Sequence, residues 1–178
     1  GITLLERLPE ITPESWIVLE LSSFQLEIMD RSPHVAAITN ITPNHLDMHP
    51  SMEHYIRAKQ NILNFQSESD FAILNYDDPI TRGLAGQCTA KVIFFSRAGQ
   101  PEGDAAFLRN EQVFVRRGAS EGTVCAIKEI KLMGQHNLEN VLAACAIASA
   151  SELEIEDMRA VVTTFRGVEH RLEPVAEI

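Results

Sequence analysis

Four short, nearly continuous apolar runs constrain the fold of this chain most strongly. They occupy residues 16–21 (WIVLEL), 34–40 (HVAAITN), 71–75 (FAILN) and 91–96 (KVIFFS). Runs of this length and composition are typical of strands that are buried on both faces of a parallel sheet. Segments with helical character separate them. This alternation predicts an α/β fold with a doubly wound, mostly parallel sheet.

The pattern changes between residues 99 and 131. The runs AAFLRN, QVFVRR and TVCAIK alternate apolar and polar residues and are separated by Gly, Asn and Ser. Such alternation is typical of short antiparallel strands, so we expect a small antiparallel appendage or extra sheet there. Helices are expected at residues 3–8, 22–30, 52–65, from 138 onward after a polar turn at 134–137, and at 155–165.

Length and composition exclude several classes of function. At 178 residues and 45% hydrophobic, the chain can form one α/β domain with a substantial core. A formal net charge of -10 argues against a nucleic-acid surface, which needs clustered Lys and Arg. Cys88, Cys125 and Cys145 form no CxxC pair, which fits buried thiols in a reducing compartment. No run has the length of a membrane span, so we expect a cytoplasmic protein without a membrane partner.

Lys59 falls on the apolar face of the helix expected at 52–65. Tyr55, Ile62 and Leu63 lie three or four residues away, so helical geometry points the lysine toward the core, where a charged amine is costly. Two interpretations are open. The stem packs on apolar neighbours while the ammonium reaches solvent or a carboxylate, or partial burial favours a neutral amine that forms a Schiff base or a carbamate.

Metal-ligand side chains lie close to Lys59 in sequence. His45, Asp47 and His49 occupy a Pro-flanked loop after the run at 34–40, where α/β folds place ligand-binding groups. This context favours a functional amine at Lys59. Glu20 interrupts the first apolar run, and a carboxylate in a buried strand needs a cation or a hydrogen-bond donor. A metal ligand and a structural glutamate are both open there.

Polar side chains recur at the expected helix ends. Ser22 is a candidate cap for the short helix that carries Gln25. Asn137 and Asn140 stand one turn apart, either as a cap and a surface amide or as a pair of amides reading a nucleobase.

Two further positions carry charge. Asp77 and Asp78 precede Pro79 and are expected to cap the following helix. Near the end of the chain, Arg171 follows His170 and could hold phosphate oxygens in a fork.

Five segments together resemble the central domain of the Mur ligase family, a P-loop-NTPase-like domain. They are ELSSFQLE (20–27), TPNHLD (42–47), YIRAK (55–59), GQHNLENVLAA (134–144) and GVEHR (167–171). They cover nearly the whole chain in the family's order. The HLD and AK motifs also occur in the broader group that includes folylpolyglutamate synthase, whereas ELSSFQL resembles the D-glutamate-adding members in particular.

The resemblance implies an ATP-dependent acid–amino-acid ligase of peptidoglycan synthesis. Such an enzyme phosphorylates the carboxylate of UDP-MurNAc-L-Ala with ATP and joins D-glutamate through an acyl phosphate. Mg²⁺ is implied as the cation that offsets the charge of phosphates and carboxylate. Lys59 matches the lysine that family members carry as a carbamate, and His45 a catalytic histidine on the second magnesium. Glu20 matches the carboxylate on the first magnesium.

The resemblance also assigns binding residues. Ser22 and Gln25 match positions near the muramoyl substrate. Asn137 and Asn140 match adenine contacts. His170 and Arg171 match residues on the ATP side of the site.

The chain departs from the family pattern in two ways. Asn44 stands where many relatives have an acid, and Met48 and Pro50 replace the common Arg and Gly around His49. No GxxxxGK[ST] phosphate loop occurs in the sequence. We therefore expect residues 1–178 to be an incomplete, monomeric central domain that is inactive by itself. The phosphate loop and a uridine-binding domain are expected before it, and a glutamate-binding domain after it.

Two other functions stay open from the sequence. One is a ligase of the same group with a different acceptor, such as another Mur-type or folylpolyglutamate-type enzyme. The other is a binding module that lacks the phosphate loop and does not catalyse a reaction.

Overall fold

A computed structural model describes residues 4–42, 49–132 and 134–168, and in it a single sheet organises the chain. Six strands follow one another in the order β1-β2-β3-β4-β5-β6. The first four are parallel, and the last two are antiparallel to their neighbours. Their bounds are β1 Val35–Ile38, β2 Phe71–Asn75, β3 Lys91–Ser96, β4 Ala105–Arg109, β5 Gln112–Arg117 and β6 Ser120–Ala126.

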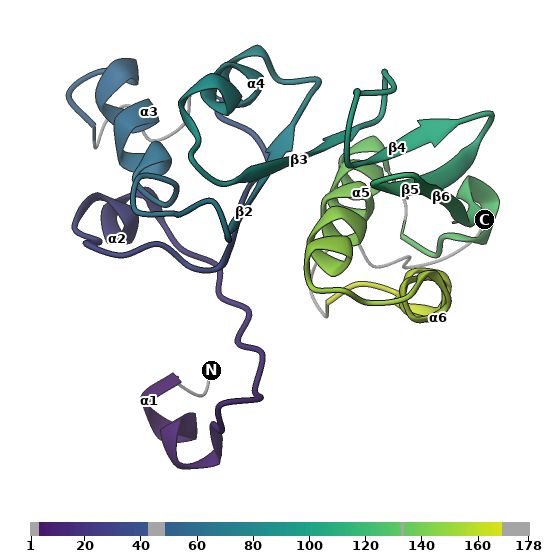
Figure 1. The fold of residues 1–178 in the computed structure, drawn as a ribbon, viewed down its shortest axis with the longest axis horizontal. Coiled ribbons are helices and arrows are strands. Elements are labelled where there is room, and N and C mark those ends of the chain that lie inside the picture. The colour runs from purple at the N-terminus through teal and green to yellow at the C-terminus, as the bar shows by residue number, and fades with distance from the viewer. Residues whose placement is uncertain (1–3, 43–48, 133, 169–178) are drawn as a thin grey trace, which may run out of the picture.

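Helices lie between β1 and β2 and between β2 and β3, and helices cover both faces of the sheet. Figure 1 shows α2, α3 and α4 to one side of β2 and β3, and α5 and α6 to the other. The α-helices are α1 Leu4–Arg7, α2 Ser23–Glu27, α3 Met52–Gln60, α4 Pro79–Leu84, α5 Gln135–Ala150 and α6 Ile155–Thr164. Three 3₁₀ turns, η1 Leu8–Glu10, η2 Ala85–Gln87 and η3 Ile127–Glu129, complete the described elements.

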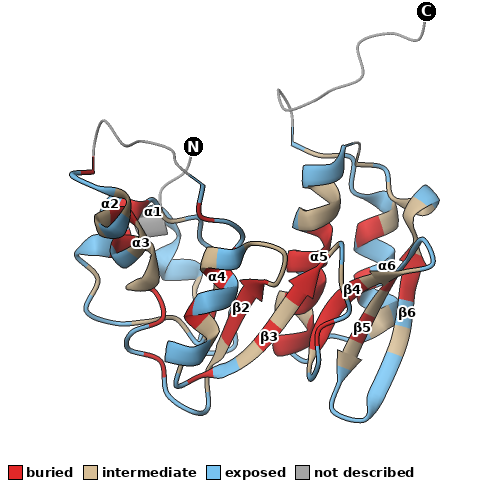
Figure 2. Cartoon of the chain, turned by 90° about the horizontal axis from the view of Figure 1, so that it is seen from above, coloured by how far each residue is buried: buried red, intermediate tan, exposed pale blue. Residues whose placement is uncertain are grey.

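The period-two alternation of β2 divides the core into two clusters. Ile73 faces a cluster with α5 and α6, while Ala72 and Leu74 face another that contains Tyr55 of α3 and Leu84 of α4. Figure 2 shows the buried residues concentrated on the central strands and the inner side of α5. An α/β fold with a mostly parallel sheet, covered on both faces, is thus confirmed.

The antiparallel strands predicted between residues 99 and 131 are present, but they do not form a separate appendage. Ala105 of β4 pairs in parallel with Phe94 of β3, so β4, β5 and β6 extend the same sheet. Ala105, Ala106 and Phe107 are fully buried. Because this stretch is covered on both faces, it continues the core.

The strand predicted at residues 16–21 is wrong for this structure. The run is extended without ladder pairing, and it links η1 to α2 away from the body of the sheet (Figure 1). Trp16 is 64% exposed and Val18 87% exposed. A buried-strand sequence needs a pairing partner and cover on both faces. Within the described residues β1 ends the sheet without a strand beyond it.

Other element boundaries moved by a few residues. The first helix is α1, and it continues as the η1 turn that contains Pro9. Helix α3 ends at Gln60, because the chain turns where Asn61 donates to Leu26 O at 2.7 Å and Met29 O at 2.8 Å. Helix α5 begins at Gln135, directly after Gly134 with φ 94°, so the expected polar turn is shorter.

The helix predicted at 155–165 is confirmed as α6. None of the described helices is long and apolar enough to cross a membrane.

Candidate functional site at the carboxyl edge of the sheet

Two adjacent aspartates tie together the loops that leave the parallel strands. Asp78 caps α4 by accepting from Ile80 N at 2.8 Å, and its other oxygen accepts from Ile41 N at 2.7 Å. Asp77 does not cap a helix, contrary to the sequence prediction. Its carboxylate accepts from Ser96 Oγ at 2.6 Å and Arg97 N at 2.7 Å after β3. The carboxyl edge of such a sheet is where α/β domains bind ligands.

The start of α5 lies at this edge. Arg97 Nε donates to Glu139 Oε1 at 3.1 Å, which joins the loop after β3 to the first turns of α5. Asn137 is half-buried and Asn140 is exposed, three residues apart on the helix. Asn137 is not an N-cap, because Gly134 occupies that position. The two amides therefore face the same side of α5 near the carboxyl edge.

Ser22 and Gln25 form a capping box at the start of α2. Ser22 N donates to Gln25 Oε1 at 2.9 Å, and Gln25 N donates to Ser22 Oγ at 3.4 Å. This confirms the capping role predicted for Ser22. Both residues are exposed, so they remain accessible to a ligand.

Lys59 is half-buried on α3, and its Nζ lies 5.2 Å from the centroid of the Tyr55 ring. Tyr55 itself is 5% exposed. Among the described residues no carboxylate pairs with Lys59. The amine is therefore held over an aromatic face, a contact worth about 0.5–1 kcal/mol when exposed. Packing of the stem along apolar neighbours fits this placement, and within residues 4–42, 49–132 and 134–168 the ammonium has no carboxylate partner.

Glu20 was expected inside a buried strand, but the structure shows it exposed in the extended segment before α2. The reason is the missing strand pairing of residues 16–21. Its carboxylate needs no buried partner there. His45 and Asp47, with Asn44 and Met48, lie outside the described residues, as do His170 and Arg171.

The structure brings together a group that the sequence did not reveal. His49 is 3% exposed, and its ring stacks on Phe24 of α2 with centroids 4.9 Å apart and an interplanar angle of 7°. The centroid of the His49 ring also lies 5.1 Å from that of Tyr55 and 5.4 Å from that of His54. His49 therefore links α2 to the helix that carries Lys59.

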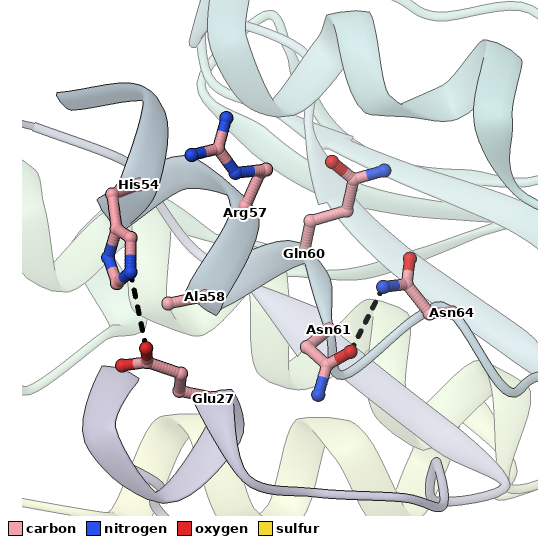
Figure 3. A pocket seen from close by; sticks show the side chains of 7 residues that line it. All are labelled: Glu27, His54, Arg57, Ala58, Gln60, Asn61 and Asn64. Carbon is pink, nitrogen blue, oxygen red and sulfur yellow. Dashed lines mark hydrogen bonds and ion pairs between the residues drawn. The ribbon is translucent and has the colours of Figure 1, made fainter. Parts of the chain in front are cut away.

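A pocket of about 370 Å³ opens beside this group, between α2 and α3. Figure 3 shows Glu27 of α2 pointing at His54 of α3, with Oε1 and Nε2 3.2 Å apart. Arg57, Gln60, Asn61 and Asn64 continue the wall.

No sequence signal could have found the pairing of Glu27 with His54. The two residues are 27 positions apart on different helices. His49 and His54, at a spacing of five, do not fall on one helical face. Only the packing of α2 against α3 brings Glu27 into contact with His54.

These features define a class of protein, an α/β domain whose polar side chains gather at the carboxyl edge of a parallel sheet. Residues 2–148 match the Mur ligase middle domain. The chain belongs to this family.

Relatives named as one particular ligase match nearly the whole chain. The UDP-N-acetylmuramoylalanine--D-glutamate ligase of Symbiobacterium thermophilum is 48% identical over 98% of this chain and 39% of the relative. The ligase of the same name from Acetivibrio thermocellus is 46% identical over 100% of this chain and 38% of the relative. The chain thus spans less than half the length of these relatives.

A solved structure supports the fold. MurF from Acinetobacter baumannii superposes with a TM-score of 0.66 at 23% identity, over 87% of this chain and 33% of that one. At this identity the likeness bears on the fold alone.

Proposed function

We propose that this chain is the middle domain of an ATP-dependent ligase that adds D-glutamate to UDP-N-acetylmuramoyl-L-alanine in peptidoglycan synthesis. The observation that carries the proposal is the 48% identity, over 98% of the chain, to a relative with that name. The ELSSFQL motif, at the capping box of α2, supports the same assignment.

The proposed reaction has two steps. The substrate carboxylate attacks the γ-phosphorus of ATP, which forms an acyl phosphate and releases ADP. The amine of D-glutamate then attacks the acyl carbon, phosphate leaves, and the nitrogen loses a proton as the amide forms. Bound Mg²⁺ supplies the charge that reduces repulsion between phosphates and carboxylate.

The geometry of Lys59 fits a carbamate. A half-buried amine with no carboxylate partner among the described residues can take up carbon dioxide and become an anion. Its oxygens, with those of Glu20, are of the kind that Mg²⁺ prefers. His45 completes the proposed metal ligands.

Nucleotide binding is proposed at the start of α5. Asn137 and Asn140 are accessible on one side of the helix, next to the loop that Asp77 and Arg97 hold at the carboxyl edge. Their amides can read the donor and acceptor edge of adenine. His170 and Arg171 are proposed on the phosphate side, and Ser22 and Gln25 near the muramoyl substrate.

We further propose that residues outside this chain complete the site, and that the whole protein is a cytoplasmic monomer. A phosphate loop and a uridine-binding domain would precede residue 1, and a glutamate-binding domain would follow residue 178. The exposed apolar run at 16–21 supports this, because such a run is normally covered.

An amide-forming assay tests the proposal. The full-length protein is incubated with ATP, Mg²⁺, UDP-MurNAc-L-Ala and D-glutamate, and ADP and the amide product are measured. Turnover that requires all four supports the proposal. Turnover with a different amino acid or acceptor would reassign it within the group. No turnover with any acceptor would favour a binding module. The chain 1–178 alone is expected to give no product.

A further inference from the structure

Ser23, His49, His54 and Glu27 form one continuous row of polar contacts between α2 and α3. Ser23 Oγ lies 2.8 Å from His49 Nε2, the two histidine Nδ1 atoms are 3.2 Å apart, and His54 Nε2 is 3.2 Å from Glu27 Oε1. Ser23 and His49 are buried, whereas the side chains of His54 and Glu27 are 32% and 42% exposed. The row begins in the interior and ends at the pocket of Figure 3.

The contact between the two Nδ1 atoms determines what this row can do. A neutral imidazole carries one N–H and one lone pair. The Glu27 carboxylate accepts a hydrogen bond from His54 Nε2–H, so in the neutral ring His54 Nδ1 carries the lone pair. When His49 places its proton on Nε2 and donates to Ser23 Oγ, its Nδ1 also carries a lone pair. Two lone pairs then face each other, an arrangement that a cation between them stabilises.

The geometry points to a binding site for Zn²⁺, or a divalent transition metal of similar preference, in which His49 Nδ1 and His54 Nδ1 are the protein ligands and Glu27 fixes the tautomer of His54 through Nε2. Zn²⁺ binds imidazole nitrogen at about 2.0–2.1 Å in tetrahedral geometry, which puts two ligand nitrogens about 3.3 Å apart. The Nδ1 atoms here are 3.2 Å apart. One ligand atom from each of the three residues lies within 4.8 Å of the others.

The surroundings have the features of a zinc site. A ligating histidine usually donates its other ring N–H to an oxygen that fixes its tautomer, and Ser23 Oγ is placed to accept from His49 Nε2. Stacking on Phe24 and a tilted contact with the Tyr55 ring hold the His49 ring in place. His54 and Glu27 line the pocket of about 370 Å³, so water can reach the site and complete the tetrahedron.

Ion binding requires little rearrangement. Without an ion, the other tautomer of His49 satisfies the same contacts, because Nδ1–H donates to His54 and the Ser23 hydroxyl donates to Nε2. Binding moves one proton of His49 from Nδ1 to Nε2 and rotates the Ser23 hydroxyl. No net proton is released from the two imidazoles.

The ligand set separates this site from the proposed magnesium centre. Two imidazole nitrogens suit zinc, whereas magnesium prefers oxygen ligands and retains its water. Helix α2 carries Ser23 and Glu27. His49 lies just before α3, and His54 lies on α3. A bound ion therefore joins His49 to the helix that carries Lys59, and the contacts of Ser23 and Glu27 tie both histidines to α2.

Calorimetric titration of Zn²⁺ into the full-length protein tests the site. The protein is first stripped with a chelator, and excess Mg²⁺ is present to occupy oxygen-ligand sites. We expect one Zn²⁺ per chain at this site. His54→Gln removes a ligand and should weaken binding by at least about tenfold. Ser23→Ala removes only the supporting oxygen, and second-shell changes cost about 10–100-fold in affinity.

His34→Gln is the matched control. His34 also pairs with a carboxylate, Asp70, at 2.8 Å, but no histidine in the described part of the chain contacts its ring. This variant should bind Zn²⁺ as the unmodified protein does. Circular dichroism confirms that each variant is folded. The inference is overturned if the unmodified protein binds no Zn²⁺, or if His54→Gln binds it as tightly as His34→Gln.

Discussion

At the scale of single residues, Lys59 and Asp70 show how one side chain's surroundings determine its chemistry. The half-buried amine of Lys59 lies over the Tyr55 ring, with no carboxylate partner among the described residues. Asp70 instead accepts hydrogen bonds from Ser67 N at 2.7 Å and Ser67 Oγ at 2.8 Å, and it contacts His34 Nδ1 at 2.8 Å. The first arrangement leaves an amine available for reaction, and the second stabilises a charge.

Lys59→Ala in the full-length protein should abolish most ligase activity. Loss of one preorganised charged group costs about 10²–10³ in turnover. If the lysine acts as a carbamate, a small carboxylate such as acetate should restore part of the rate. Lys91→Ala is the matched control, because Lys91 Nζ also lies over an aromatic ring, 5.5 Å from the Phe71 centroid. Near-normal turnover of the Lys59 variant would show that the amine is structural.

Asp70 should make stability depend on pH in the acid range. Hydrogen bonds from the Ser67 backbone, from His34 and from the Ser67 hydroxyl lower the pKa of Asp70 from 3.8 to about 2. A lowered pKa adds stability above the unfolded value, and this stability is lost as pH falls from about 4 toward 2. Asp70→Asn should therefore lower the melting temperature at pH 6 more than at pH 2.5. An equal loss at both values would contradict the prediction.

At the scale of elements, the junction of α2 and α3 positions the site. Asn61, at the end of α3, donates to Leu26 O and Met29 O, at the end of α2 and just beyond it. Carbonyls at the end of a helix lack the full set of intrahelical donors, and Leu26 O accepts from Met29 N at 3.1 Å as well as from Asn61. The same pair of elements holds His49 against Phe24 and Tyr55. The sequence predicted both helices, but not their contact.

Asn61→Ala should destabilise the fold by about 1–3 kcal/mol, because it removes two partly buried hydrogen bonds, those to Leu26 O and Met29 O. Urea unfolding at pH 7 measures the loss. Asn64→Ala is the control, since the exposed Asn64 side chain donates only to Asn61 Oδ1 at 3.0 Å (Figure 3). It should change stability by less than about 0.5 kcal/mol. Equal effects of the two variants would show that the α2–α3 ties contribute little.

At the scale of the whole molecule, the apolar segment at residues 16–21 lies outside the sheet and is left uncovered. Residues 16–21 have the composition of a buried strand, yet Trp16, Val18 and Leu19 are largely exposed. The chain spans about 39% of the length of its relative from Symbiobacterium thermophilum. Both observations fit a domain whose neighbours complete it.

The fluorescence of Trp16 reports directly whether residues 16–21 are covered, because Trp16 is the single tryptophan of the chain. In the chain 1–178 we expect acrylamide to quench its fluorescence almost as strongly as that of a free indole. In the full-length protein, where we propose that other residues cover the run, quenching should be weaker. In the full-length protein, the fluorescence of Trp16 is obtained by subtracting the fluorescence of the Trp16→Phe variant from that of the unmodified protein. Equal quenching in both proteins would mean that the run stays exposed.

The sequence by itself determined the elements of the central sheet. The runs at 71–75 and 91–96 became β2 and β3 with the predicted bounds, because their apolar residues need cover on both faces wherever they pack. Helical spacing likewise identified α6 and the apolar face of α3. Local periodicity carries this information, and so does the motif set that identified the family.

Only the tertiary structure decided how distant segments meet. It joined the antiparallel strands to the main sheet and left residues 16–21 without a partner. It also placed His49 between Phe24 and Tyr55, and Glu27 against His54. These contacts join residues on separate elements, and periodicity along one segment does not specify which other segment will cover it.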